Sequence, residues 1–417
     1  MTVRTVLLVR LFFAVALLLG VACSSSETRS AAAGPDQILQ AAVEAGKVAG
    51  VVATAASPEG VIHQGVFGKK SEESGEPMRA DTIFRIASMT KPATSVAVMQ
   101  LVEQGKVSLD ESVGAYLPEL KNPKVLEGFD SDGKPRLRGA TRPPTIRELL
   151  SHTSGYAYSI WNEDMGRYES SVELPSGRDR LWKLPLASDP GSRWEYSAST
   201  DILGVLVEAV SGMTLEAYFQ NNIFQPLGME DTTFQMPAAK WSRVAATYQR
   251  GPDGSLGPTA RPLPDAPPPV TFFGGGGGLY STAPDYIRFL RALLGDGRLN
   301  GADLLKPETV ALMSQNQIGE LDAGTMTSFR PETSANVNLF PNSKDKFGLG
   351  FLINTQPVEG GRAAGSLAWA GLFNTYFWID REKNVCGVLL TQVLPFADPT
   401  VLAVLEDYER AVYANVH

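Results

Sequence analysis

The sequence contains few of the residues that build covalent crosslinks and metal centres. Its 417 residues include two cysteines, Cys23 and Cys386, and three histidines. Cys23 ends an apolar N-terminal segment and Cys386 lies within an apolar strand pattern, so we expect no disulfide between them and interpret Cys386 as a small buried hydrophobic residue. The histidines have no paired spacing. The sequence therefore gives no basis for a zinc site, and we expect no metal or cofactor.

Positive charge is also scarce. The chain has 37 lysine and arginine residues against 45 aspartate and glutamate residues, a formal net charge of -8 and a pI near 5.2. Because nucleic-acid-binding proteins need a basic surface, this balance argues against a nucleic-acid partner. We expect a small-molecule substrate instead, and the oligomeric state stays open.

The apolar N-terminal segment is too short to span a bilayer. Residues 11–21 fall below the roughly 20 apolar residues that a spanning helix needs. With Arg4 and Arg10 before them, they resemble a signal peptide covering residues 1–23. The sequence Leu-Gly-Val-Ala-Cys at 19–23, before a serine-rich tract, resembles a bacterial lipoprotein cleavage site. We therefore expect an exported protein, either periplasmic or held at a bacterial membrane by a lipid anchor at Cys23.

No Gly-x-Ser-x-Gly sequence occurs, which argues against an α/β-hydrolase esterase. A candidate nucleophile comes instead from residues 83–105, which predict a short strand followed by a helix that ends at Gly105. Ser88 and Lys91 share one face of the first turn, so the amine can reach the hydroxyl. The positive end of the helix would stabilise an oxyanion and disfavour the ammonium form of Lys91, which could then accept the serine proton.

The Ser-x-x-Lys pattern is weak evidence on its own. It occurs again at Ser131/Lys134, in a turn, and at Ser343/Lys346, in a charged loop, and neither match begins a helix. Ser88 could also be an ordinary helix N-cap. The nucleophile therefore needs support from the rest of the chain.

A serine hydrolase needs a second proton carrier. Tyr196, in a tight loop that enters a helix, is the best candidate, with packing of the loop as the alternative. Tyr158 and Tyr280 carry the same Tyr-Ser dipeptide and are set aside as decoys. We interpret His63 as a strand residue and His152 as a structural residue at a helix end.

Two further stretches favour a cleft for substrate. The five glycines at 274–278 suit close backbone approach, and Gly276 and Gly277 are candidate substrate contacts, with a flexible surface loop as the alternative. Trp369, Ala370 and Gly371 precede a strand whose edge could lie against a substrate carbonyl. The backbone N–H of Leu372 could then act beside that of Ser88 as an oxyanion donor.

Strand patterns lie at both ends of the chain, and helices with long Pro- and Gly-rich loops lie between them. We predict an α/β fold of the α+β kind, with one antiparallel sheet formed by both termini, flanked by helices, and a large, mostly helical insertion. The expected parts are a linker at 24–35, an α/β domain from 36–108 and 344–417, and a mostly helical domain at 109–343. The expected sheet strands are 50–56, 61–67, 347–353, 374–380 and 385–391.

Taken together, these motifs resemble the serine β-lactamase and penicillin-binding-protein superfamily, most closely its family VIII carboxylesterases, which are like class C β-lactamases. The matching segments are 84–91, 145–155, 190–197, 224–231, 274–279 and 369–371. The resemblance implies a β-lactamase/DD-peptidase-like fold. It implies that Ser88 is the acylated nucleophile, Lys91 its base partner and Tyr196 the second acid/base, with the oxyanion hole at the amides of Ser88 and Leu372.

Two departures from the lactamase pattern favour small esters over β-lactams. Trp369-Ala-Gly371 stands where lactamases carry Lys-Thr-Gly, and Ala198 occupies the asparagine position of their Tyr-x-Asn motif. The sequence thus predicts a serine carboxylesterase of short-chain esters, which can carry weak β-lactamase activity in addition. The alternatives are a class C-like β-lactamase or D-alanyl carboxypeptidase, and a non-catalytic ligand-binding lipoprotein.

Overall fold

The computed structural model describes residues 33–259 and 262–415. The predicted signal peptide at 1–23, with its candidate lipid-anchored Cys23, and most of the linker lie outside the described residues. Residues from Ala33 onward form one compact unit.

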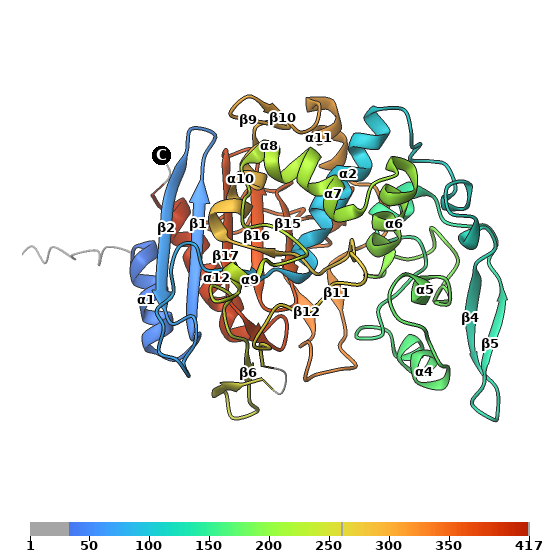
Figure 1. Ribbon diagram of the computed structural model, residues 1–417, viewed down its shortest axis with the longest axis horizontal. Coiled ribbons are helices and arrows are strands. Elements are labelled where there is room, and N and C mark those ends of the chain that lie inside the picture. The colour runs from blue at the N-terminus through green and yellow to red at the C-terminus, as the bar shows by residue number, and fades with distance from the viewer. Residues whose placement is uncertain (1–32, 260–261, 416–417) are drawn as a thin grey trace, which may run out of the picture. The chain divides into compact units, whose positions relative to one another are not determined.

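A seven-stranded antiparallel sheet forms the centre of this unit (Figure 1). Its strands come from both ends of the chain, which confirms the predicted architecture. In spatial order they are β13 (Lys346–Phe347), β14 (Leu352–Ile353), β15 (Leu367–Gly371), β16 (Thr375–Asp380), β17 (Val385–Leu390), β1 (Gly50–Ala56) and β2 (Val61–Gly68). The N-terminal hairpin joins the C-terminal strands where Ala53 pairs with Leu389.

Helices cover both faces of the sheet. Successive strand residues point to opposite faces, and Trp378 of β16 contacts Tyr408 of α12 (Pro399–Tyr413), whereas its neighbour Phe377 contacts Tyr286 of α10 (Ala283–Leu294). The terminal helix α12 therefore covers one face together with α1 (Pro35–Glu44), and α10 covers the other. Every residue of β1, β15, β16 and β17 is buried, as a sheet covered on both sides requires.

The strand-to-helix junction around Ser88 has one more element than the sequence predicts. Strand β3 (Phe84–Arg85) leads into a 3₁₀ helix, η1 (Ala87–Thr90), and the α-helix α2 (Lys91–Glu103) begins only at Lys91. Pro92 accounts for the late start, because its ring lacks an N–H and suits the first turn of an α-helix. Almost all of α2 is buried, so the helix anchors its N-terminal end deep in the molecule.

In the middle of the chain, short helices are the main regular elements, and long loops make up most of the residues. Its helices are α3 (Ile146–Leu150), α4 (Glu163–Ser171), α5 (Arg178–Leu181), α6 (Ser199–Ser211), α7 (Leu215–Phe219), α8 (Gln225–Leu227), α9 (Ala238–Trp241) and α11 (Pro307–Met313). The predicted capping box of α3 is present, with Thr145 and Glu148 as its members. Helix α6 packs on α2 and α3, which brings the loop before α6 toward Ser88.

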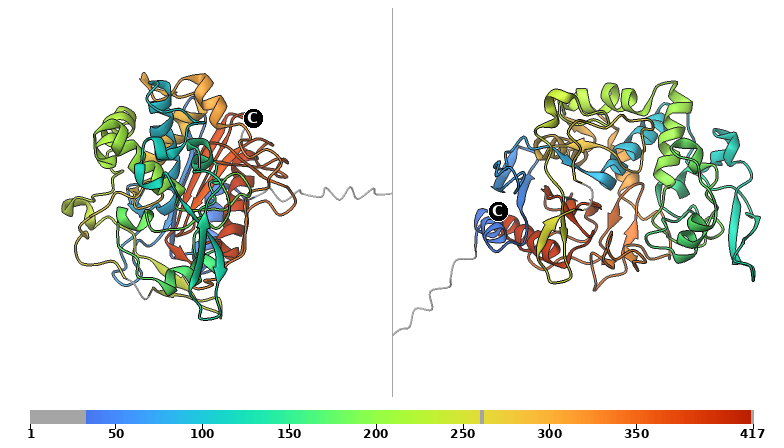
Figure 2. Two further views of the ribbon diagram at one scale, coloured as in Figure 1. Left: turned by 90° about the vertical axis from the view of Figure 1, so that its right-hand side faces the viewer. Right: turned by 60° about the horizontal axis from the view of Figure 1, so that its bottom comes forward.

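Short strands, absent from the prediction, also occur in this region. The hairpin β4 (Lys124–Phe129) and β5 (Pro135–Gly139) lies at the end of the molecule far from β2 (Figures 1 and 2). The others are β6 (Tyr248–Arg250) and β7 (Leu256–Pro258) with β18 (Val393–Leu394), β8 (Tyr280–Ser281) with β3, β9 (Arg298–Leu299) with β10 (Ala302–Asp303), and β11 (Thr325–Met326) with β12 (Val337–Asn338).

One predicted strand is wrong in its extent. Residues 347–353 were expected to be continuous, but the chain turns between β13 and β14. Gly350 has a φ of 103°, a conformation that suits glycine and breaks the extended backbone. The division at 109 and 343 remains an interpretation of the sequence, since residues on both sides of each boundary belong to the same compact unit.

Each helix in the described ranges 33–259 and 262–415 falls short of the length or the apolar character that a membrane span needs. The neighbours α6 and Leu215–Leu227 reach that length and composition only as a pair bent by 79°.

A buried ion pair ties α12 to the loop after β14, and it generates a stability prediction. Arg362 and Glu409 are each 4% exposed, and Nε of Arg362 donates to Oε1 of Glu409 at 2.8 Å. Glu409→Gln leaves the guanidinium buried without its counter-charge, so we expect the free energy of unfolding to fall by about 3 kcal/mol.

Urea denaturation followed by circular dichroism measures this loss. The control is Asp407→Asn on the same helix, whose pair with Arg410 is about half exposed and should change stability by less than about 1 kcal/mol. Equal midpoints for the two variants would contradict a stabilising role for the buried pair.

Candidate active site

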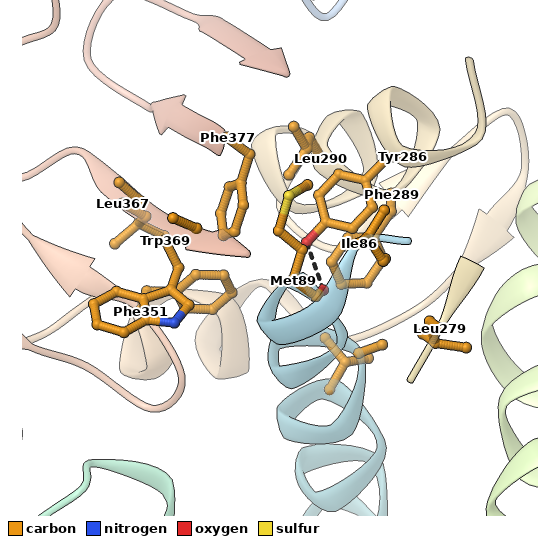
Figure 3. Close-up of a cluster of buried hydrophobic side chains, with 14 of the residues drawn as sticks. Ile86, Met89, Leu279, Tyr286, Phe289, Leu290, Phe351, Leu367, Trp369 and Phe377 are labelled. Carbon is orange, nitrogen blue, oxygen red and sulfur yellow. Dashed lines mark hydrogen bonds between the residues drawn. The ribbon is translucent and has the colours of Figure 1, made fainter. Parts of the chain in front are cut away.

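Ser88 lies on a sharp turn held by packing from the sheet side. Ala87, just before it, has a φ of 43°, a left-handed conformation that few non-glycine residues adopt. The hydroxyl of Tyr286 donates to the carbonyl of Met89 at 2.8 Å (Figure 3), and Ile86 and Met89 are fully buried among aromatic side chains of α10 and the sheet. Contacts with α10 and the sheet therefore fix the turn. Ser88 itself is half-buried and lines a cavity.

Lys91 joins Ser88 to three other parts of the chain. Its Nζ lies 3.4 Å from Oγ of Ser88, 3.2 Å from the hydroxyl of Tyr158 and 2.7 Å from the carbonyl oxygen of Gly276. Tyr158 and Gly276 can hold two N–H groups of the amine, which leaves its third position directed at the Ser88 hydroxyl. Lys91 is 2% exposed, so its amine is held in place and shielded from bulk water.

Tyr158 and Asp201 extend this network, and sequence reasoning missed both. The Tyr158 hydroxyl donates to Oδ2 of Asp201 at 3.4 Å while it accepts from Lys91. Burial and the neighbouring carboxylate raise the pKa of Tyr158 well above its ordinary value, and burial raises the pKa of Asp201. Tyr158 therefore stays a neutral phenol that connects the lysine to the carboxylate.

Tyr196 lies beside the same lysine in a different arrangement. Nζ of Lys91 is 4.6 Å from the centre of the Tyr196 ring, and the Tyr196 hydroxyl oxygen accepts a hydrogen bond from the indole N–H of Trp369 at 3.1 Å. Among the described residues, no hydrogen bond joins Tyr196 to Ser88 or Lys91. Its oxygen has one donor, so its own proton is available to an acceptor in the cavity.

The glycine tract packs against the site through its backbone. Gly276 accepts from Lys91 and its N–H donates to Oδ1 of Asp201 at 2.9 Å, while the carbonyl of Gly275 accepts from Thr94. A Cβ on Gly275 would lie 2.4 Å from the carbonyl oxygen of Thr200. This part of the tract consists of glycines because the backbone itself occupies the space of a side chain.

Residues 369–372 approach the nucleophile turn from the sheet. Strand β15 contacts η1, and a Cβ on Gly371 would lie 2.2 Å from the carbonyl oxygen of Ile86. Leu372 follows the last paired residue of β15 and lines the same cavity as Ser88. Trp369 reaches the site through Tyr196, whereas Ala370 is buried and does not line that cavity.

Two adjoining cavities meet at this network. The first, about 310 Å³, has Ser88, Tyr158, Tyr196 and Leu372 among its lining residues. The second, about 400 Å³, is lined by Asp201, Gly276 and apolar residues such as Met236. Tyr158, Gly277, Gly278 and Tyr280 line both. The two cavities are thus separated by a wall of shared residues, and a molecule bound at Ser88 has space in both of them.

His152 does not contact Ser88. It is buried, its Nδ1 lies 3.2 Å from Oγ of Ser197, and its ring packs edge-on against Tyr196 at 4.9 Å. Burial, assisted by the charge of Lys91, lowers the pKa of His152 well below its ordinary value, so the ring is neutral. Among the residues that the structure describes, no group of three His, Cys, Asp or Glu side chains is placed to hold a metal ion.

A signal for Tyr158 and Asp201 was present in the sequence but could not be used. Tyr158 carries the same Tyr-Ser dipeptide as Tyr196, and Asp201 lies in the first turn of the helix that follows Tyr196. Neither observation places the two side chains together. Only the packing of α6 against α2 brings them to Lys91.

Comparisons with known proteins find one family model and several relatives that match most of the chain. The Beta-lactamase family model matches residues 35–407. Lovastatin esterase from Penicillium rubens is 31% identical over 90% of this chain and 96% of its own, and monacolin J acid methylbutanoyltransferase from Aspergillus terreus is 33% identical over 93% and 97%. The unliganded structure of simvastatin synthase from Aspergillus terreus has a TM-score of 0.79 at 31% identity, covering 91% of this chain and 97% of that one.

The Asp201 contacts generate a test of the network. Asp201→Asn keeps the side-chain shape but places an amide where the carboxylate accepts from Tyr158 or Gly276. We expect kcat to fall roughly 10- to 100-fold, because the Lys91 amine loses its fixed position. Burial raises the pKa of the Asp201 carboxyl, so its protonation should contribute to the acid limb of the wild-type pH–rate profile. The variant lacks this group, and its acid limb should therefore lie at lower pH.

Stopped assays between pH 5 and 9 measure both effects. The control is Asp179→Asn, which neutralises an exposed carboxylate on α5. A variant with lowered kcat but an unmoved profile would show only structural damage, and an unchanged kcat would remove Asp201 from the network.

Proposed function

The chain belongs to the Beta-lactamase family, and we propose that within it the protein is a serine carboxylesterase that hydrolyses short-chain esters through an acyl-serine intermediate. The observation that carries the proposal is the contact of a buried lysine amine with the Ser88 hydroxyl at the wall of a cavity. We assign the protein to the family VIII branch because Trp369-Ala-Gly371 replaces the lysine-containing motif of lactamases.

The proposed mechanism has two steps. Ser88 attacks the ester carbonyl and passes its proton to Lys91, while the backbone N–H groups of Ser88 and Leu372 bind the developing oxyanion. The alcohol leaves with a proton from the Lys91/Tyr196 pair. Water activated by the same pair then releases the acid and regenerates Ser88. Every proton moves between groups that line the cavity or contact Lys91.

Acyl transfer to an alcohol is the second candidate. The acyl-serine intermediate is the same, and the acceptor replaces water in the second step. Two observations favour it: a cavity of about 400 Å³ adjoins Ser88's cavity, and one relative of similar length is named a methylbutanoyltransferase. A β-lactamase or D-alanyl carboxypeptidase is less well supported, because the third motif holds Trp369 rather than lysine.

We further propose that the enzyme acts outside the cytoplasm. The support is the signal-peptide pattern at 1–23 and the lipoprotein-like sequence ending at Cys23. A non-catalytic lipoprotein with this fold is the remaining alternative, and the intact Ser88, Lys91 and Tyr196 argue against it.

A substrate panel tests the proposed function. Purified wild type and Ser88→Ala are assayed with p-nitrophenyl butyrate and with nitrocefin. We expect the wild type to hydrolyse the ester much faster than nitrocefin, and Ser88→Ala to lose at least roughly 1000-fold of ester turnover, because nucleophilic catalysis ends. The matched control is Ser343→Ala, at the serine of another Ser-x-x-Lys sequence.

Three results would overturn parts of this proposal. Equal turnover by wild type and Ser88→Ala ends the assignment of the nucleophile. Nitrocefin hydrolysis faster than ester hydrolysis supports the lactamase alternative. A short alcohol is also added to the p-nitrophenyl butyrate assay. If the butyryl group then appears mainly as the ester of that alcohol, with little free butyric acid, acyl transfer is the main reaction.

A further inference from the structure

Arg85 is the charged residue in the lining of the Ser88 cavity. The other described residues around that cavity are uncharged: Ala87, Ser88, Tyr158, Ile160, Trp161, Tyr196, Gly277, Gly278, Leu279, Tyr280, Leu372 and Phe373. Arg85 belongs to β3, directly before the nucleophile turn. A cation in an otherwise apolar and neutral cavity needs an explanation.

The guanidinium of Arg85 has no carboxylate partner among the described residues. Its one side-chain hydrogen bond runs from Nη2 to the hydroxyl of Thr247, and its Nε is buried without any acceptor. Burial lowers the pKa of Arg85 from its ordinary value, and the only charge effect that opposes this comes from Tyr280, a neutral phenol at pH 7. By contrast, Arg362 and Arg250, whose side chains are also largely buried, each form an ion pair with a carboxylate.

Phe373 holds the guanidinium in one orientation. The Cζ atom of Arg85 lies 4.3 Å above the centre of the Phe373 ring, and Phe373 lines the same cavity next to Leu372. Stacking of this kind occupies the flat face of a guanidinium and leaves its edge donors available. Arginine retains its charge even when buried, and a buried unpaired cation is costly.

We propose that Arg85 binds a carboxylate of the substrate, so that the enzyme prefers esters whose acid or alcohol part carries a carboxylate. This inference rests on the proposed esterase function and names its substrate class. The substrate carboxylate supplies the counter-charge that the Arg85 guanidinium lacks among the described residues. The position of Arg85 beside the Leu372–Phe373 wall places that anion on the side of the cavity where the oxyanion donors are expected.

The missing motif lysine strengthens the argument. The third motif contributes Trp369, whose indole N–H is engaged by Tyr196, so this motif offers no cation to the substrate. Nζ of Lys91 is engaged within the protein by Ser88, Tyr158 and Gly276. Arg85 is thus the cation that remains available to an acidic substrate.

Matched substrate pairs test the inference. The acid-side pair is the mono-p-nitrophenyl ester of glutaric acid and its neutral methyl-capped diester. The alcohol-side pair is the acetate ester of para-hydroxybenzoic acid and that of its methyl ester. For each pair, the measured quantity is kcat/KM for the carboxylate substrate divided by kcat/KM for its neutral partner. For at least one pair, we expect Arg85→Gln to lower this ratio roughly tenfold from its wild-type value, which corresponds to about 1.4 kcal/mol.

Two control variants isolate the charge. Arg85→Lys, which keeps a cation without the planar edge, should retain part of the preference. Arg79→Gln, an exposed arginine on the preceding segment, should leave the ratio at its wild-type value. The ratio is used because it does not depend on the fraction of active enzyme.

The outcomes separate this inference from the function on which it rests. The carboxylate site alone is overturned if wild type and Arg85→Gln show equal ratios for both pairs while ester turnover still depends on Ser88. Turnover that survives Ser88→Ala overturns the function itself. If Arg85→Gln does not fold, the wild type decides: glutarate should inhibit neutral-ester hydrolysis at least tenfold more strongly than glutaramide, and equal inhibition contradicts the site.

Discussion

The arrangement of the site depends on one buried lysine. Lys91 is the first residue of a helix that is buried along almost its whole length, and its amine contacts groups from η1, from the loop before α4 and from the glycine tract. Burying an amine is costly unless its donors are satisfied. The fold meets this requirement with acceptors from distant segments. These acceptors contact the amine next to Ser88, where the two cavities adjoin.

The surrounding structure can be understood as support for that lysine. The turn before Lys91 is fixed by the sheet and by α10, whose Tyr286 donates to the carbonyl of Met89. Helix α6, which packs on α2, carries Asp201. Asp201 in turn orients Tyr158 and the Gly276 amide. Displacing any one of these supports would move the amine relative to Ser88, which is why we treat Tyr158 and Asp201 as positioning residues.

The sequence was sufficient to predict features that depend on local spacing. The pairing of Ser88 with Lys91 follows from three-residue separation at a helix start, and the antiparallel sheet follows from alternating strand patterns at both ends of the chain. The glycine tract could be placed at a cleft because five glycines have no side chains to pack.

Features that depend on packing between distant segments could not be predicted. Tyr158 and Tyr196 have the same local sequence, and only the structure shows that one contacts the Lys91 amine through its hydroxyl and the other through its ring face. Arg85 looked like part of a strand, and its lack of a counter-ion becomes visible only when Phe373 and Thr247 are in place around it. The 3₁₀ helix η1 and the left-handed backbone at Ala87 likewise do not follow from helical periodicity.

The central claim is that Ser88 becomes a nucleophile because it contacts the Lys91 amine. Mass spectrometry of the intact protein after brief exposure to a fluorophosphonate, followed by peptide mapping, measures this directly. We predict one adduct per chain, on Ser88, and a labelling rate at least roughly 100-fold lower in Lys91→Met, since a serine without its base is a poor nucleophile. Labelling of another residue, or equal labelling of both proteins, would contradict it.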